Sequence, residues 1–548
     1  MSTETVDAVV VGAGQNGLTA AAVLVMRSDG QMYALTAAAV LADAGWDVLV
    51  LEEQHEVGGA VRTAELHPGF RMDLFSAFYP LAAASPAFRA LDLSSHGLRL
   101  RRAPRVYGHA AGPHDEDAAV VFPDVTETAA ELERRHPGDG STWIRLTEQW
   151  KDIREPFLSA LFEPFPPVRG PAGLIRRLGT ADALRFVRML ALPARRMSEE
   201  LFGGEHARLL LLGNAMHADT PVDSAGSGIM GYVLTMLAQD VGYPVPEGGA
   251  GELAAALARR GEHSGARILC GRKVTGIEVG GGRVTEVRTE QGERVRVRRA
   301  VLADVSAPAL FGSLLPADAV PAAVRDDLRR FEWDTPVVKV NYAFDRPIPW
   351  RSQALATAGT VHLGADADGL VHWSADLATG RVPEHPFIIF GQMTTTDPAR
   401  SPEGTESAWA YTHLPRGVAD DASAEELARR VDAELEAHAP GVLSSIVHRS
   451  VQRPRDLEAA NANLVGGAVN GGTAQIHQQL VFRPLPGFGG PRTPVEGVYL
   501  AGSSTHPGGG VHGMCGWNAA RAALRDHGVG GRLRRRLNEA ISDVLTRS

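Results

Sequence analysis

Three side chains in this 548-residue sequence have types and positions suited to chemistry on a bound ligand. Lys339 stands in the apolar run VVKVNY, where a lysine is uncommon unless its amine reaches water, a carboxylate or a cofactor. His506 and His512 flank three consecutive glycines, and a loop histidine can shuttle a proton because its pKa lies near neutrality. Less reactive roles stay open: a solvent-facing lysine on an edge strand, or histidines that only bond the loop backbone or shape the turn.

The elements that must position these side chains begin at the N-terminus. The apolar run at residues 8–11 predicts a buried parallel strand, and Gly12, Gly14 and Gly17 follow it in the spacing GxGxxG. Gly12 permits a tight turn, Gly14 permits close approach to a pyrophosphate, and Gly17 permits close packing of the next helix. That helix would direct free N–H groups and a positive dipole end at the phosphates. The order predicts a dinucleotide site.

The second strand of this unit is expected at residues 48–51 and ends in Glu52, which can accept hydrogen bonds from a ribose. Glu52 lies 35 positions after the last glycine of the motif, whereas about 20 are typical. The cause is a repeat, because LTAAAVL occurs at 18–24 and again at 35–41. We expect a helix, a turn at the capping-box-like residues 28–31 and a second helix, with the first copy facing the phosphates. A sequence artefact is the alternative.

A second glycine motif follows Glu52. Gly58 and Gly59 permit close approach to a flat or charged ligand, and Arg62 can pair with a phosphate. Together with Glu52, this loop favours FAD over NAD. Here the sequence resembles the amine oxidase and phytoene desaturase superfamily of FAD enzymes, in which a GGxxRT motif follows the ribose-binding glutamate. The resemblance implies that the backbone of Val274 lies against the adenine and that Lys339 holds a water at flavin N5.

The C-terminal block resembles the phytoene desaturase branch of that superfamily. An apolar strand at 497–502 leads into a glycine-rich loop at 503–513 and then a helix. A helix N-terminus beside a glycine loop offers positive potential to the charge that reduced flavin carries. Cys515 could tether a flavin, but a small buried helix residue is the better interpretation. No CxxC pair is present, which argues against dithiol redox chemistry.

The predicted site therefore has a catalytic set and a cofactor set. The candidate catalytic residues are Lys339, His512 and His506. The candidate FAD-binding residues are Gly12, Gly14, Gln15, Asn16, Gly17, Glu52, Glu53, Gly58, Gly59, Arg62, Val274, Gly502, Ser503, Gly510, Val511, His512 and Gly513. Tyr79, Asp73 and His217 stand in stretches expected to line a cavity, and each is more often structural. No His, Cys or acidic cluster has metal-ligand spacing.

The expected fold class is α/β: a Rossmann-type FAD-binding domain, with a parallel sheet and a β-hairpin layer, plus an inserted α+β substrate domain. The hairpin is expected at 274–288, followed by strands at 294–298 and 300–302. The chain is divided into FAD-binding parts and substrate parts in alternation: 1–86, 245–330 and 471–548 for FAD, 87–244 as a helical cap, and 331–470 as substrate-domain sheet and helices.

Composition limits the partners. The net charge is −9 and no basic stripe with interleaved aromatics occurs, which argues against nucleic acid as a partner. With two distant cysteines, no signal-like N-terminus and no membrane-spanning apolar run, the expected compartment is the cytoplasm. The arginine-rich stretch 174–196 could lie on a lipid surface, although a solvated helix face is the simpler interpretation. A homodimer is a further expectation.

The function expected from these motifs is FAD-dependent removal, or return, of a hydride at a C–C bond of an apolar small molecule. Amine oxidation is the alternative within the same class. A flavin-binding protein with an interaction role and no turnover is the alternative from another class, and a lipid-surface carrier is the weakest.

Overall fold

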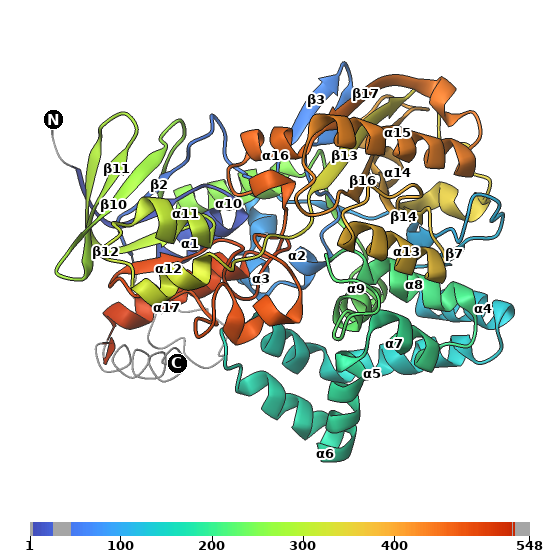
Figure 1. The fold of residues 1–548 in the computed structure, drawn as a ribbon, viewed down its shortest axis with the longest axis horizontal. Coiled ribbons are helices and arrows are strands. Elements are labelled where there is room, and N and C mark those ends of the chain that lie inside the picture. The colour runs from blue at the N-terminus through green and yellow to red at the C-terminus, as the bar shows by residue number, and fades with distance from the viewer. Residues whose placement is uncertain (1–3, 26–44, 529, 532–548) are drawn as a thin grey trace.

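Two seven-stranded sheets organise the chain in this computed structural model, which describes residues 4–25, 45–528 and 530–531 (Figure 1). The first sheet has the order β10-β11-β12-β1-β2-β9, with β18 paired to β12. The second has the order β17-β13-β16-β15-β14-β6-β7. Two small sheets pair β3 (Thr63–His67) with β4 (Phe70–Asp73), and β5 (Leu100–Arg101) with β8 (Val245–Pro246).

The first sheet has a parallel centre and an antiparallel hairpin at one end. Its strands are β1 (Glu4–Val11), β2 (Val48–Leu51), β9 (Arg267–Leu269), β10 (Val274–Gly280), β11 (Arg283–Thr289), β12 (Arg294–Ala303) and β18 (Val498–Leu500). The four residues of β2 are all buried, as expected for a parallel strand covered on both faces. The two strands expected at 294–303 are one strand, β12, because its alternating half continues directly into its apolar half.

Three helices from distant parts of the sequence cover one face of this sheet. They are α1 (Gln15–Val25), α10 (Gly251–His263) and α17 (Met514–His527), and α1 packs against both of the others. The first LTAAAVL copy lies in α1, directly after the glycine motif. The turn expected at 28–31 and the second copy at 35–41 lie outside the described residues.

The second sheet lies beside the first, with α15 (Asp421–His438) on its outer face. Its strands are β6 (Arg105–His109), β7 (Ala119–Val121), β13 (Val337–Phe344), β14 (Ala358–Leu363), β15 (Ile388–Gln392), β16 (Glu406–His413) and β17 (Ile446–Gln452). Strand β13 lies between β17 and β16, and all eight of its residues are buried. The alternative of a solvent-facing edge-strand lysine at position 339 is therefore wrong.

The stretch 87–244 is not only helical, as the sequence suggested. Its strand β6 pairs in parallel with β14 and in antiparallel with β7, so both join the second sheet. These strands have five and three residues and are too short to show a periodic pattern. The helices of this stretch include α4 (Val125–Arg135), α5 (Asp139–Phe162), α6 (Arg169–Ala191), α7 (Ala194–Leu201), α8 (Glu205–Ala215) and α9 (Gly228–Asp240). Helix α6 projects from the body at the bottom of Figure 1.

Shorter helices complete the fold. They are α2 (Pro80–Ala84), α3 (Pro86–Ala90), α11 (Ala307–Ala309), α12 (Ala322–Leu328), α13 (Ala367–Ala378), α14 (Met393–Thr396) and α16 (Pro454–Ala460). Within the described part of the chain, no helix is both long enough and apolar enough to cross a bilayer.

Candidate functional site

A cavity of about 380 Å³ lies where the two sheets meet. One end is lined by the carboxyl ends of β1 and β2, at Val11 and Leu51. The other part is lined by β13 and β16 of the second sheet, through Lys339 and Tyr411. Ligands of open α/β sheets bind outside the carboxyl ends of the strands, which is where this cavity opens.

The glycine motif forms a tight cradle at the first end of the cavity. Gly12 has φ +92°, and a Cβ on Gly17 would come within 2.1 Å of the Gly12 carbonyl oxygen. The Gly17 N–H donates to Asp304 Oδ2 at 2.8 Å, and a Cβ on Gly14 would lie 2.8 Å from the same oxygen. The cradle therefore has room only for glycine, and it brings the backbone of α1 up to the cavity.

Asp304 is the main residue of this end that the sequence motifs did not identify. It follows β12 and is buried, and burial raises the pKa of its carboxyl to about 7. Its backbone joins β1 through the Asp304 N–H and the Val11 carbonyl, at 2.8 Å. A carboxyl group at the N-terminus of α1 is favourably placed toward the helix dipole.

Glu52 lies at the end of β2, as predicted, and lines the cavity. Its Oε2 accepts the Ala13 N–H at 2.5 Å, and its Oε1 accepts the Gln54 N–H at 2.9 Å. Burial raises the pKa of this carboxyl, which the two backbone donors oppose. Glu53 and Val274 line the same end, so an acidic, partly apolar recess adjoins the cradle.

The second glycine motif packs against one side of the glycine cradle and is held to it by a backbone hydrogen bond. The Gly58 N–H donates to the Ala13 carbonyl at 2.8 Å, and Gly59 lines the cavity. Arg62 does not line it. The Arg62 guanidinium instead donates to the carbonyls of Gly59, at 3.0 Å, and Ala460, at 2.7 Å, so it fixes the loop from behind.

The C-terminal loop closes the other side through Gln15. Its side chain donates to the Gly510 carbonyl at 3.2 Å and accepts the Gly513 N–H at 2.6 Å. Asn16 approaches Ser503 Oγ at 3.5 Å through its amide nitrogen. The motif at residue 12 and the loop at residue 510 thus form one wall. Gly510, Val511 and Ser503 line the cavity, whereas Gly502 and Gly513 lie behind it.

These residues fit the expected FAD. The side-chain oxygen of Asn16 is buried without a hydrogen-bond partner among the described residues, although Asn16 lines the cavity. The first turn of α1 also has backbone N–H groups without intrahelical acceptors. A pyrophosphate would satisfy these N–H donors, a hydroxyl or N–H group of the cofactor would satisfy the Asn16 oxygen, and the Glu52 carboxylate would suit ribose hydroxyls. The protein groups that would hold FAD are therefore the glycine cradle, Asn16, Glu52 and the loop at Ser503.

Lys339 lies in the other part of the cavity, with its side chain almost fully buried. Its Nζ donates to the backbone carbonyl of Asp73 at 2.7 Å and to the side-chain oxygen of Asn341. The third donor position has no acceptor among the described residues, and the indole of Trp409 lies 5.7 Å away. Burial lowers the pKa of Lys339 to about 7. This amine can therefore give up or take a proton near neutrality.

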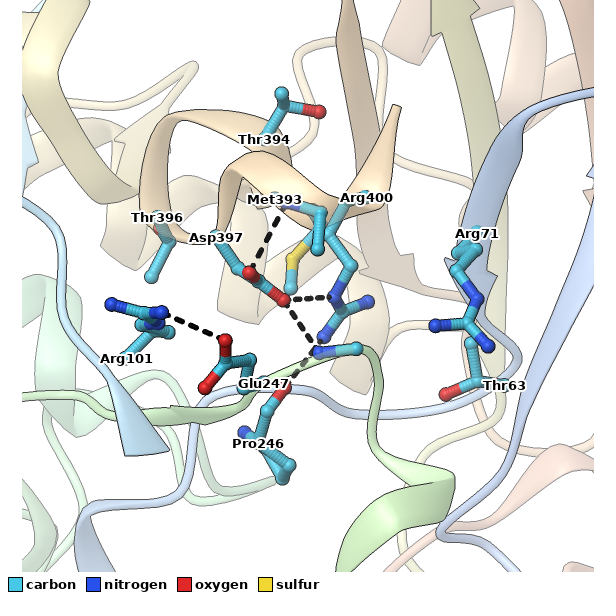
Figure 2. A network of polar contacts seen from close by, with 12 residues as sticks. Thr63, Arg71, Arg101, Pro246, Glu247, Met393, Thr394, Thr396, Asp397 and Arg400 are labelled. Atoms are coloured by element: carbon cyan, nitrogen blue, oxygen red, sulfur yellow. Dashed lines mark hydrogen bonds and ion pairs between the residues drawn. The ribbon is translucent and has the colours of Figure 1, made fainter. Parts of the chain in front are cut away.

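A buried ionic network supports Lys339 from behind. The Asp73 carboxylate accepts Arg400 at 2.9 Å, and Arg400 also donates to Asp397 at 3.0 Å. Asp397 in turn accepts the Gly248 N–H at 2.8 Å. Figure 2 shows Asp397 and Arg400 directed at the loop that carries Pro246. The network links β4, whose last carbonyl accepts the Lys339 amine, to the loop before α10.

The predicted roles of both loop histidines disagree with the structure. His512 is buried and does not line the cavity: its ring packs against Phe162 at 5.4 Å, and its Nδ1 accepts the Met514 N–H at 3.0 Å. His506 is also buried outside the cavity, and burial lowers the pKa of each histidine to about 4. Loop spacing does not reveal side-chain direction, which the turns at Gly508 and Gly510 reverse here.

Five other residues can now be placed. Cys515 is buried in α17 outside the cavity, and burial raises the pKa of its thiol to about 12. Tyr79 and His217 line the cavity. Asp73 does not line it, and its backbone carbonyl accepts the Lys339 amine. Tyr411, also a lining residue, was missed, and its alternating strand AWAYTH was the available signal.

Known proteins resemble this chain along most of its length. The sequence model of the family described as flavin containing amine oxidoreductase matches residues 35–524, starting in the second LTAAAVL copy. A Rattus norvegicus protein named pyridine nucleotide-disulfide oxidoreductase domain-containing protein 2 is 29% identical, over 95% of this chain and 93% of its own. One of the limonene dehydrogenase polypeptides of Castellaniella defragrans is 22% identical, over 95% of each chain. Putrescine oxidase bound to putrescine shares the fold, with a TM-score of 0.59 and 16% identity, over 95% of this chain and 99% of that one.

Proposed function

The chain belongs to the flavin containing amine oxidoreductase family and is an FAD-dependent oxidoreductase, and we propose that it oxidises an apolar small molecule at a C–C bond. One observation carries this proposal. The carboxylates that line the cavity, those of Glu52, Glu53 and Asp304, all lie at the glycine-motif end. No carboxylate of the described residues lines the part that contains Lys339, and the apolar residues that line the cavity include Phe75, Phe78, Leu81, Met230, Leu234, Val337, Leu457 and Leu464.

An apolar lining selects the substrate by burial. Removing apolar surface from water stabilises binding by about 25 cal/mol per Å². A cationic amine would lose its hydration there without a carboxylate partner among the described residues that line this part. The lining therefore supports an uncharged, mainly apolar substrate over a charged amine. The name of the limonene dehydrogenase relative points to the same substrate class.

When bound, the flavin supplies a two-electron acceptor for a hydride. The remaining roles belong to side chains of this protein. The apolar wall excludes water and orients the C–H bonds, and Lys339 handles the proton. In its neutral form the Nζ of Lys339 has a lone pair not used by Asp73 or Asn341, so it can accept the proton released from the adjacent carbon, directly or through one water.

Anaerobic reduction of the holoenzyme tests the proposal. Purified protein is mixed without oxygen with limonene or, as the competing class, with cyclohexylamine, and the flavin absorbance is followed. Bleaching by limonene or a related alicyclic alkene, with none by the amine, is the expected result. Bleaching by the amine alone would establish amine oxidation and overturn the C–C assignment.

We further propose that α6 contacts an anionic lipid surface, from which an apolar substrate could enter. Helix α6 exposes Ile175, Leu184 and Val187 at 50, 67 and 60%, on a segment rich in arginine. Arg185 and Arg188 pair with Asp182 and Glu200, so Arg176 and Arg177 supply the charge that favours anionic lipid.

Vesicle sedimentation tests this contact. Wild-type protein should sediment with vesicles containing phosphatidylglycerol more than with phosphatidylcholine alone, and Leu184→Ser with Val187→Ser should abolish the difference. Equal sedimentation of the wild type and this double variant would show that α6 is only a solvated helix.

A further inference from the structure

The cavity contains a second nitrogen group that the oxidation chemistry described above does not use. His217 follows α8, lines the cavity, and its Nε2 lies 2.9 Å from the Nε2 of His362 on β14. The two rings meet edge to face, with centroids 5.1 Å apart. A hydrogen bond between two imidazole nitrogens needs one donor and one acceptor, so the pair must share a single proton along this line.

The environment of His362 decides which ring donates. Its Nδ1 is buried and has no hydrogen-bond partner among the described residues. It also lies against Gly213 of α8, where a Cβ would come within 2.2 Å of this nitrogen. A proton on Nδ1 would be a buried donor without an acceptor, which folded proteins avoid, whereas a lone pair can face the glycine Cα–H at little cost. The proton of His362 therefore lies on Nε2, and Nε2 donates to His217.

The same logic then fixes His217. Because its Nε2 accepts from His362, its own proton must lie on Nδ1. No hydrogen bond within the described part of the chain reaches this Nδ1, and the side chain borders the cavity. Burial lowers the pKa of His217 to about 4 and lowers the pKa of His362 well below its usual value, so both rings are neutral near pH 7. His217 therefore presents one neutral N–H donor to the cavity.

We propose that His217 Nδ1–H binds an oxygen of the substrate, so that the substrate is an apolar molecule carrying a carbonyl or hydroxyl oxygen. His362 acts as the positioning residue that sets the tautomer. The assignment deepens the proposed function and rests on it. An unpaired buried donor is costly, so a pure hydrocarbon would leave His217 unsatisfied, whereas an oxygen acceptor would satisfy it. A hydrogen bond to a carbonyl would also stabilise negative charge that develops there and so acidify the adjacent C–H bond.

A matched ligand pair tests the donor. Cyclohexanone and methylenecyclohexane have nearly the same shape and differ in C=O against C=CH₂. Their dissociation constants are measured on the oxidised holoenzyme by the change in flavin absorbance. We expect the ketone to bind about tenfold more tightly in wild type, an advantage lost in His217→Leu and reduced in His362→Phe. His438→Gln, a buried histidine on α15 that does not line the cavity, is the matched control and should keep the preference.

A spectroscopic measurement keeps the test independent of how these variants fold. In ¹⁵N-histidine-labelled wild-type holoenzyme, long-range ¹H–¹⁵N spectra should show His217 protonated at Nδ1 and His362 at Nε2, with peaks assigned from their loss in the two variants. Protonation of His217 at Nε2 would overturn the assignment, as would a ketone preference that survives His217→Leu. Either result leaves the proposed function standing, which fails separately if no apolar compound reduces the flavin.

Discussion

Asp304 Oδ2 accepts a hydrogen bond from the backbone N–H of Gly17 at 2.8 Å, so a buried carboxyl group holds the N-terminus of the helix that faces the cofactor site. The two residues are 287 positions apart in the sequence. The same oxygen lies against Gly14, and burial raises the pKa of the Asp304 carboxyl to about 7. Cofactor binding and the protonation of Asp304 are therefore coupled.

The affinity for FAD should fall as the pH rises above about 7. A bound pyrophosphate disfavours the charged form of Asp304, so binding takes up a proton above the pKa of the free site. The dissociation constant should rise by up to about tenfold per pH unit between pH 7 and 9 in wild type. Asp304→Asn should flatten this slope in fluorescence titrations of apoprotein with FAD, and parallel slopes would refute the coupling.

The stability of the apoprotein should also depend on the protonation of Asp304, and the pKa of this carboxyl predicts the direction of the pH dependence. The folded pKa of Asp304 is raised, so between about pH 4 and pH 7 the unfolded chain loses this proton first. As the pH rises across this range, the free energy of unfolding should therefore fall more in wild type than in Asp304→Asn. Urea unfolding measures this difference. A difference of the opposite sign would contradict the assigned burial of the carboxyl.

Replacing Lys339 by methionine should slow flavin reduction by about 100-fold or more while FAD stays bound, because proton transfer contributes factors of this size. In wild type the rate should rise with pH to a plateau above about 7, since the pKa of Lys339 is lowered to about 7 and the neutral amine accepts the proton. Stopped-flow reduction across pH 5.5–9 measures both. Lys151→Met, on α5, is the control and should behave as wild type. An unchanged pH profile in Lys339→Met would remove Lys339 from the proton path.

Arg400→Met should destabilise the protein by about 3–5 kcal/mol, because it leaves two buried carboxylates, Asp73 and Asp397, without their partner. Adding Asp397→Asn should restore part of the loss. Arg381→Met, which removes an exposed pair with Asp376, should cost less than about 1 kcal/mol. Chemical unfolding measures all three, and equal effects of the two arginine changes would show that the pairs of Arg400 with Asp73 and with Asp397 are not stabilising; the Asp397 pair is drawn in Figure 2.

Gly14→Ala should weaken FAD binding by about 100-fold, because the new Cβ would lie 2.8 Å from Asp304 Oδ2, so the Asp304 carboxyl or the cradle backbone must shift. Gly112→Ala is the matched control, since no atom lies within 4 Å of the added Cβ. Flavin content after purification and titration with FAD report the effect. Yellow Gly14→Ala protein with wild-type affinity would show that the cradle tolerates a side chain.

The order of motifs along the sequence was enough to predict the dinucleotide-binding unit and the hairpin. Strand β1, the glycine motif, strand β2 with Glu52, and the hairpin β10–β11 follow one another with recognisable turns, so their positions were predictable. Strands β6 and β7 were missed because strands of five and three residues are too short to give a periodic signal.

Side-chain partners across long separations were not predictable. Asp304 with Gly17, Asp73 with Arg400, and His217 with His362 lie 287, 327 and 145 positions apart in the sequence and become neighbours only in the folded chain. The lysine in β13 could be identified as unusual from its apolar neighbours, but its burial depended on β17 and β16 on either side. The direction of His512 depended on backbone turns that composition does not encode.

Anaerobic mixing of the holoenzyme with limonene, with cyclohexanone and with cyclohexylamine, followed at the flavin absorbance, tests the proposed C–C oxidation most directly. We predict bleaching by an apolar alicyclic compound, slowed about 100-fold or more by Lys339→Met, and none by the amine. Bleaching by cyclohexylamine alone, or equal rates in wild type and Lys339→Met, would contradict the proposed chemistry.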